Sequence, residues 1–192
     1  AGTGGSAAPP AAAGQGGQGG QGGQPTVGAS ASGPPQPAGL GGELRADAEV
    51  PVAYRAAITT AGRLCGRYPV TPALVAAMLR TESNFDPQLR SPQTDEYGIA
   101  KWTPAVFEQW ARDTDGGGPS VFSATDSIDA LGRYLCGMSS RPEFMSLPGD
   151  QALLLAAAYR GGSRHVIAAR DVPAQVRGYV DEVARHIRAY SA

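Results

Sequence analysis

The chain has 192 residues, of which 42% are hydrophobic and 17% are charged, and its formal net charge is −1. This length suits one folded domain with or without a tail, and the near-neutral charge does not fit a nucleic-acid partner, whose phosphates require a basic surface. Because the sequence has no run of about 20 apolar residues, we also expect no membrane span.

The first 42 residues differ in composition from the rest of the chain. They contain no Asp, Glu, Lys, Arg or His, yet they hold 15 of the 27 glycines and 6 of the 16 prolines, and they include the repeat GQGGQGGQGGQ. Such a segment cannot bury enough apolar surface to offset the entropy that ordering would cost. We predict a disordered Gly/Pro/Gln-rich linker over residues 1–42, acting as a spacer, and a folded domain over residues 43–192.

Helical patterns begin in this domain with the Ala-rich run PVAYRAAITTAGRLCGRY. Thr71-Pro72 then predicts a helix start, since a capping residue is followed by proline at the first helical position. Pro87 ends that helical region, because the residue before a proline avoids the α conformation. Thr103-Pro104 repeats the start signal and opens the run AVFEQWARD.

Three further helical patterns complete the domain. The run TDSIDALGRYLCGM begins with a cap from Thr125 or Asp126, and the most apolar run, PGDQALLLAAAYRGG, stops at a glycine pair. The last, VPAQVRGYVDEVARHIRAY, has apolar residues at helical spacing: Val176, Val180, Val183 and Ile187. Because alternating strand-like runs are scarce, we predict an all-α domain of about six or seven helices.

The two cysteines, Cys65 and Cys136, lie in separate helical patterns. With no histidine nearby, they do not fit the spacing of a zinc site. Two interpretations stay open at this point, a pair of buried free thiols or a disulfide, and the disulfide implies an oxidising compartment. The small residues at the start of the chain, Ala1-Gly2-Thr3, are those expected of a processed secreted protein.

Other metal or cofactor motifs are weak. Asp113 and Asp115 occupy the first and third positions of a calcium-binding loop, but the twelfth position, which requires a bidentate glutamate, is Ala124. We interpret this segment as a solvated turn. His165 and His186 have no metal-ligating residue at a suitable spacing, so we expect surface or helix-end histidines, no metal and no cofactor.

Glu82 is the residue that calls for a chemical explanation. In the stretch LVAAMLRTESNFDP it follows Met78 by four residues and Leu79 by three, on the apolar stripe of a helix. A glutamate in this setting usually extends to water, but the negative end of the helix dipole and the apolar surroundings both raise its pKa. Polar neighbours at 81, 83 and 84 would supply hydrogen bonds. A carboxyl group that is protonated near neutral pH suits general-acid cleavage of a glycosidic bond.

Four blocks, ESNFDP, YGIAKWTP, AAAYRGG and VPAQVRGYV, resemble in this order the blocks of the soluble lytic transglycosylase domain. This family is the bacterial branch of the goose-type lysozyme superfamily, and the resemblance covers about residues 50–190. It implies a lysozyme-like helical domain with a glycan groove. It also implies cleavage of the β-1,4 bond between N-acetylmuramic acid and N-acetylglucosamine in peptidoglycan. The C6 hydroxyl of the muramyl residue attacks its own anomeric carbon and leaves a 1,6-anhydro end, with assistance from the substrate N-acetyl group.

The resemblance also implies roles for individual residues. Glu82 would be the sole acid and base, and Ser83 would orient it or contact the glycan. The wall of the groove would be formed by Gly98, Ile99 and Ala100. Tyr159 and Tyr179 would line the site near the carboxyl group, with core aromatics whose hydroxyls are satisfied as the alternative.

One catalytic carboxylate agrees with the sequence, whereas most glycosidases need two at a set separation. The nearest other candidate, Asp86, fits a solvated or capping residue before Pro87. Asp95 and Glu96 lie in a polar loop. No second carboxylate has a setting comparable to that of Glu82.

Three departures from the family pattern leave the activity open. Lys101 stands where a glutamine is usual, Arg160 where an asparagine is usual, and Gln175-Val176 where many members have an acid and a threonine. A cation within about 4–6 Å of Glu82 would lower its pKa and weaken the acid step. Alternatively, both cations face the groove and bind the carboxylates of the peptides attached to the glycan.

We therefore expect a secreted, cell-wall-associated lytic transglycosylase that acts on peptidoglycan glycan strands. The alternatives are a catalytically impaired protein that binds cell-wall glycan or a wall enzyme, and a hydrolase in which water replaces the C6 hydroxyl. Secreted actinobacterial members of the family have a similar pair of cysteines, so the resemblance favours a Cys65–Cys136 disulfide.

Overall fold

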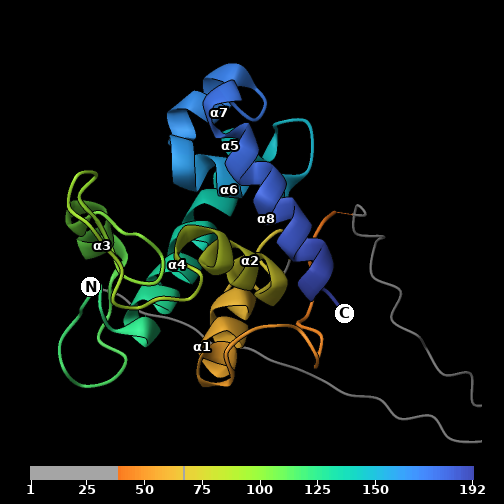
Figure 1. Cartoon of the computed structure of the whole chain (residues 1–192). Helices are drawn as coiled ribbons and strands as arrows, with labels where there is room; N and C mark the ends of the chain where they lie inside the picture. Colours follow the sequence, from red (N-terminus) through yellow and green to blue (C-terminus); the bar gives the residue numbers. More distant parts are fainter. Residues whose placement is uncertain (1–38, 67) are drawn as a thin grey trace, which may run out of the picture. The chain divides into compact units, whose positions relative to one another are not determined.

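The computed structural model describes residues 39–66 and 68–192 (Figure 1). Most of the predicted linker, residues 1–38, therefore lies outside the described residues. The first described residues already contact the domain: the Leu40 N–H donates to Asp150 Oδ2 at 2.6 Å, and the Ala73 N–H donates to the Gly42 carbonyl at 3.1 Å. Contacts with the domain thus begin before residue 43, where we predicted its start.

The described residues form eight α-helices, which confirms the predicted all-α class. The helices are α1 (Val52–Arg63), α2 (Pro72–Ser83), α3 (Pro104–Trp110), α4 (Ala124–Ser139), α5 (Pro142–Met145), α6 (Gln151–Gly161), α7 (Ser163–Ala169) and α8 (Arg177–Tyr190). A short 3-10 helix, η1 (Ala174–Val176), precedes α8, and two antiparallel strands, β1 (Arg90–Ser91) and β2 (Glu96–Tyr97), form a small hairpin. The sequence did not predict α5 and α7. Across the described ranges, no helix has the length and apolar character needed to cross a membrane.

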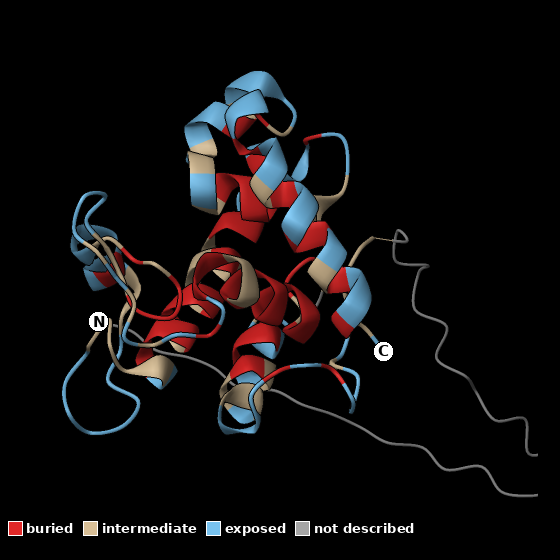
Figure 2. Cartoon of the chain, viewed as in Figure 1, coloured by how far each residue is buried: buried red, intermediate tan, exposed pale blue. Residues whose placement is uncertain are grey.

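The core is built around α2, whose residues from Pro72 to Leu79 are all buried (Figure 2). The helix begins as predicted, with Thr71 Oγ1 accepting a hydrogen bond from the Leu74 N–H at 3.2 Å. On one side it packs against α1, and on another against the buried stripe of α8. Because α8 also packs against α6, it connects α2, which carries Glu82, to α6, which carries Tyr159 and Arg160.

Two predicted helix boundaries are wrong. The cap of α4 is Ser123, whose hydroxyl accepts from the Asp126 N–H at 3.3 Å, rather than Thr125 or Asp126. The Asp126 side chain is buried and accepts hydrogen bonds from Thr114 instead. Helix α2 ends at Ser83 rather than near Pro87, because Asn84 adopts a left-handed conformation with φ of 55°.

A disulfide joins Cys65, which follows α1, to Cys136 in α4, with a Cα–Cα distance of 5.7 Å. This confirms the disulfide interpretation and excludes the free thiols. The bridge spans 71 residues, a range that contains α2, the hairpin and α3. In the chain-entropy model, closing a loop of this length stabilises the fold by about 4 kcal/mol.

We expect the double variant Cys65→Ala/Cys136→Ala to lose about 2–5 kcal/mol of the free energy of unfolding, because the unfolded chain is no longer constrained. Urea denaturation measures this loss. The native protein unfolded in the presence of reductant serves as the control and should match the variant. Equal stability of the variant and the oxidised native protein would contradict the prediction, as would maleimide labelling of both thiols in denatured protein that has not been reduced.

Candidate functional site

The Glu82 carboxyl group is buried at the next-to-last position of α2, with 2% of its side chain exposed. Tyr179 of α8 faces it, and Arg160 of α6 and Lys101 are the cations near it. Among the described residues, Glu82 Oε1 has no hydrogen-bond partner. A carboxyl group in such a dry setting favours its neutral form.

Burial raises the pKa of Glu82 to about 7, in the direction that the sequence predicted. The Tyr179 hydroxyl and the two cations lower this pKa and only partly offset the burial. The polar neighbours do not supply the expected hydrogen bonds, because Thr81 donates to the Ala77 carbonyl and Ser83 donates to the Ile99 carbonyl. Desolvation, rather than local hydrogen bonding, therefore raises the pKa of Glu82.

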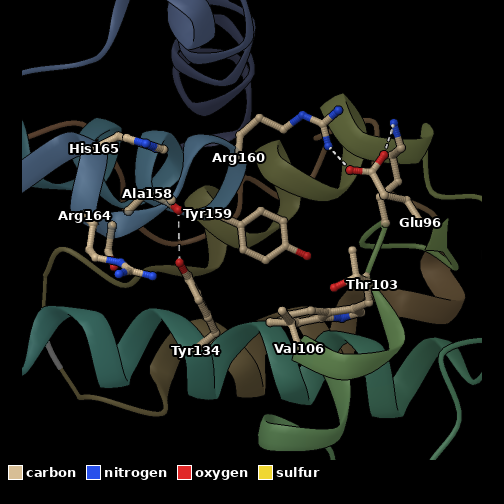
Figure 3. Close-up of a pocket in the computed structure, with 13 residues that line it drawn as sticks. Glu96, Thr103, Val106, Tyr134, Ala158, Tyr159, Arg160, Arg164 and His165 are labelled. Carbon is tan, nitrogen blue, oxygen red and sulfur yellow. Dashed lines mark hydrogen bonds and ion pairs between the residues drawn. The ribbon is translucent and has the colours of Figure 1, made fainter. Parts of the chain in front are cut away.

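Glu96 is the site residue that the sequence analysis missed. Its side chain is only 14% exposed, so the interpretation of this position as a polar loop was wrong. Figure 3 shows Arg160 directed at its carboxylate, with Arg160 Nη1 2.6 Å from Oε1. Lys101 Nζ lies 3.3 Å from Oε2. By contrast, Arg160 Nη1 is 3.7 Å from Glu82 Oε2. The sequence signal for Glu96 was the presence of Lys101 and Arg160, because two cations near a buried carboxyl group require a nearby anion.

The charge state of Glu96 follows from its partners. Burial alone would raise the pKa of Glu96, but hydrogen bonds from the Thr94 hydroxyl and the Arg160 guanidinium, with the positive charges of Arg160 and Lys101, lower it overall. Glu96 is therefore ionised at neutral pH. When Glu82 is protonated, the side chains of Glu82, Glu96, Lys101 and Arg160 together carry one net positive charge.

The predicted groove wall lies against the core. Ile99 and Ala100 are fully buried, so their side chains do not face the groove. Their carbonyls hold this segment in place: Ser83 donates to the Ile99 carbonyl at 2.6 Å, and Tyr159 donates to the Ala100 carbonyl at 2.5 Å. At Gly98, φ is 74° and an added Cβ would lie 1.9 Å from the Val121 carbonyl oxygen, so only glycine fits. Contact of this segment with glycan stays a prediction.

The two tyrosines differ in their hydrogen bonding. The Tyr159 hydroxyl is satisfied by Ala100, as expected of a core aromatic, and its ring packs edge-on against Trp102. The Tyr179 hydroxyl has no hydrogen bond of good geometry with any described residue, although it faces Glu82 closely enough to lower its pKa. Burial raises the pKa of both tyrosines well above the usual value, so both remain neutral donors.

Backbone strain is concentrated around the charged side chains. Positive φ angles occur at Asn84 (55°) and Phe85 (64°), directly after the helix that carries Glu82, at Asp95 (54°), directly before Glu96, and at Lys101 (50°). Such conformations cost on the order of 1–3 kcal/mol each for residues other than glycine. The surrounding packing therefore fixes the directions in which these side chains project.

A pocket of about 640 Å³ opens beside this charge cluster (Figure 3). Its lining includes Glu96, Lys101 and Arg160, together with residues that the sequence analysis had not assigned to a site: Trp102, Tyr134, Arg164 and His165. His165 is thus a pocket residue, although it also matches the predicted helix-end position. Aromatic faces next to polar groups suit a sugar ring, which presents both apolar and hydroxyl surfaces.

The oxygens of Asp113, Asp115 and Asp126 lie within 4.8 Å of one another. Backbone N–H groups already bind these carboxylates: Asp113 accepts from the Gly116 N–H at 2.6 Å and Asp126 accepts from the Thr114 N–H at 2.8 Å. This is the bonding of a turn, as the sequence analysis interpreted residues 113 and 115.

Comparison with known proteins adds one finding. A family model described as transglycosylase SLT domain matches residues 62–177. The matched range contains Glu82, Glu96, Lys101 and Arg160 and ends two residues before Tyr179. No curated protein matches the chain.

The buried carboxyl group predicts that stability depends on pH. Folding raises the pKa of Glu82 from 4.5 to about 7. The protonated side chain therefore stabilises the fold below the unfolded pKa, and this contribution is lost as the pH rises through the folded pKa. Glu82→Gln has no proton to lose. Between pH 4.5 and about 7, we therefore expect the native protein to lose stability relative to Glu82→Gln as the pH rises. The difference in the free energy of unfolding should change by at most about 1.4 kcal/mol per pH unit.

Urea denaturation at a series of pH values measures this difference. Glu43→Gln, which removes an exposed carboxylate paired with Arg63, is the matched control and should show no such trend. A constant difference between Glu82→Gln and the native protein throughout the window would show that Glu82 titrates normally.

Proposed function

We propose a function from one established premise: this chain belongs to the transglycosylase SLT family. The family consists of peptidoglycan lytic transglycosylases, which cleave the glycan strands of bacterial cell walls. We propose that this protein breaks the β-1,4 bond between N-acetylmuramic acid and N-acetylglucosamine, with Glu82 as the sole acid and base. The observation that carries this proposal is the buried carboxyl group, whose pKa lies at about 7, beside a pocket lined with aromatic side chains.

A single carboxyl group with this pKa suits both proton transfers. Protonated Glu82 donates its proton to the glycosidic oxygen as the bond to the muramyl anomeric carbon breaks, and the substrate N-acetyl carbonyl stabilises that carbon. The ionised carboxylate then takes the proton of the C6 hydroxyl, whose oxygen bonds to the anomeric carbon and closes the 1,6-anhydro ring. Glu82 gives up one proton in the first step and takes one back in the second, so it ends protonated and no second carboxylate is required.

The neighbouring groups have supporting roles in this scheme. The Tyr179 hydroxyl, which faces Glu82, donates to the carboxylate once it is ionised. Tyr134 and Tyr159, with the buried Trp102 packed behind them, form an aromatic wall that packs against a sugar ring, and Lys101 and Arg160 border the same pocket. Ser83 and the segment 98–100 hold the hairpin beside Glu82, with the backbone of that segment next to the glycan.

Glu96 is not a second catalytic carboxylate in this scheme, because it is ionised and bound by two cations. We further propose that the protein acts outside the cell, in association with the wall, where its disulfide is stable.

A catalytically impaired glycan-binding protein is the second candidate function. The observation that favours it is the approach of Arg160 Nη1 to 3.7 Å from Glu82 Oε2. A closer ion pair would keep Glu82 ionised at neutral pH and remove the general acid, while leaving the pocket available for binding glycan.

Purified peptidoglycan incubated with the protein distinguishes these functions, with the fragments analysed by mass spectrometry. We expect anhydro-muropeptides from the native protein and a loss of about 100-fold or more with Glu82→Gln, because general-acid catalysis is removed. Glu43→Gln removes an exposed carboxylate paired with Arg63 and should behave as native.

Other outcomes identify the alternatives. Reducing ends in place of anhydro ends would identify a hydrolase. Co-sedimentation of the native protein with peptidoglycan, without any cleavage, would identify the binding protein and contradict the enzymatic proposal.

A further inference from the structure

Two permanent cations beside a proton donor pose an electrostatic problem. An opposite charge within about 4–6 Å favours the ionised carboxylate, and Arg160 lies inside this range of Glu82. Nevertheless, the Arg160 guanidinium lies 1.1 Å closer to Glu96 than to Glu82, since the two N–O distances are 2.6 and 3.7 Å. Lys101 likewise forms its ion pair with Glu96.

We propose that Glu96 is a positioning residue that binds Arg160 and Lys101 and thereby holds Arg160 in a long ion pair with Glu82, at 3.7 Å, rather than a close one. This inference rests on the proposed function, in which Glu82 must be protonated to act. Glu96 does not touch the reacting atoms in this account. It acts through the placement of two cations.

The fold holds Glu96 in place for this role. In the hairpin, Glu96 pairs with Ser91, and its Oε2 accepts a hydrogen bond from the Thr94 hydroxyl at 2.9 Å. The two carboxylate oxygens are divided between the cations, Oε1 for Arg160 and Oε2 for Lys101. Because the hydrogen bond from Arg160 joins two charged groups, it is stronger than a hydrogen bond between neutral groups.

The groups that face Glu82 come from three parts of the fold. Helix α8 contributes Tyr179, helix α6 contributes Tyr159 and Arg160, and the segment from β2 onward contributes Glu96 and Lys101. Both tyrosines are neutral, since burial raises the pKa of each well above its usual value. Within this set of described residues, Glu96 is the only anion facing Glu82.

Removing the charge of Glu96 therefore changes the site in two ways. The variant loses the negative charge that raises the pKa of Glu82. It also releases Arg160, which needs to move only a short distance to bind Glu82 Oε2 directly. Both changes favour ionised Glu82, so the general acid is lost at a lower pH.

The test compares the pH dependence of peptidoglycan cleavage in four proteins: native, Glu96→Gln, Arg160→Asn and Glu96→Gln/Arg160→Asn. We expect the high-pH limb of the Glu96→Gln profile to move to lower pH by about one unit or more, because Glu82 loses its proton earlier. Arg160→Asn removes the cation and should move this limb upward. The midpoint of the double variant should lie closer to the native value than that of Glu96→Gln, because Arg160 is absent and Lys101 alone remains to lower the pKa of Glu82.

A purely structural role for Glu96 makes a different prediction. Glu96→Gln would then lower activity by the same factor at every pH and leave the midpoint unchanged. If instead the midpoint fell, a structural cause would leave it equally low in the double variant, because removing Arg160 would not repair the structure. Either result would overturn the proposal. Thr94→Val removes only the hydroxyl that supports Glu96, so this milder variant should shift the limb in the same direction by a smaller amount even if Glu96→Gln folds poorly.

A second measurement does not depend on activity. The pH window in which the native protein loses stability relative to Glu82→Gln reports the pKa of Glu82, and we expect the same window, measured in the Glu96→Gln background, at lower pH. If no protein cleaves peptidoglycan, the proposed function fails while this measurement still decides the role of Glu96. An unchanged window in Glu96→Gln would refute that role, and Glu43→Gln, which removes a remote paired carboxylate, controls for the charge change.

Discussion

The carboxyl group of Glu82 is held out of water at the C-terminal end of α2, where the helix dipole also disfavours its ionised form. This setting is a consequence of core packing, because α2 lies against α1, α4 and α8 and its last turn shares their dry environment. The resulting pKa of about 7 makes every nearby charge consequential. The hairpin, α6 and α8 place the charged and hydroxyl groups around Glu82, and their positions therefore determine its pKa.

Lys101 and Arg160 satisfy this constraint together with Glu96. One carboxylate bound to two cations leaves a single positive charge beside neutral Glu82. In the proposed mechanism, that residual charge stabilises the carboxylate that forms once Glu82 has donated its proton. A closer Arg160 would stabilise the carboxylate before the reaction as well, and the general acid would be lost. Arg160 lies 2.6 Å from Glu96 and 3.7 Å from Glu82. It is therefore near enough to stabilise an ionised Glu82, but not so near that it forms a close ion pair with Glu82 before the reaction.

The sequence predicted those features that depend on local patterns. The stripe ending at Glu82 and the start at Thr71-Pro72 are encoded in helical spacing and capping, and the structure has both. The cap of α4 was mispredicted because the Asp126 side chain is engaged by Thr114, twelve residues earlier in the chain. Glu96 was missed because its burial depends on the packing of a two-residue strand against α6. A helical spacing pattern in the sequence does not predict such a contact.

The most direct test of this account is the titration of the Glu82 carboxyl carbon by ¹³C NMR in the native protein, with the resonance assigned by its absence in Glu82→Gln. The account predicts a midpoint close to the value of about 7 that burial produces. A midpoint near 4.5, the ordinary value for a glutamate, would show that the cations keep Glu82 ionised, and would contradict its role as a general acid.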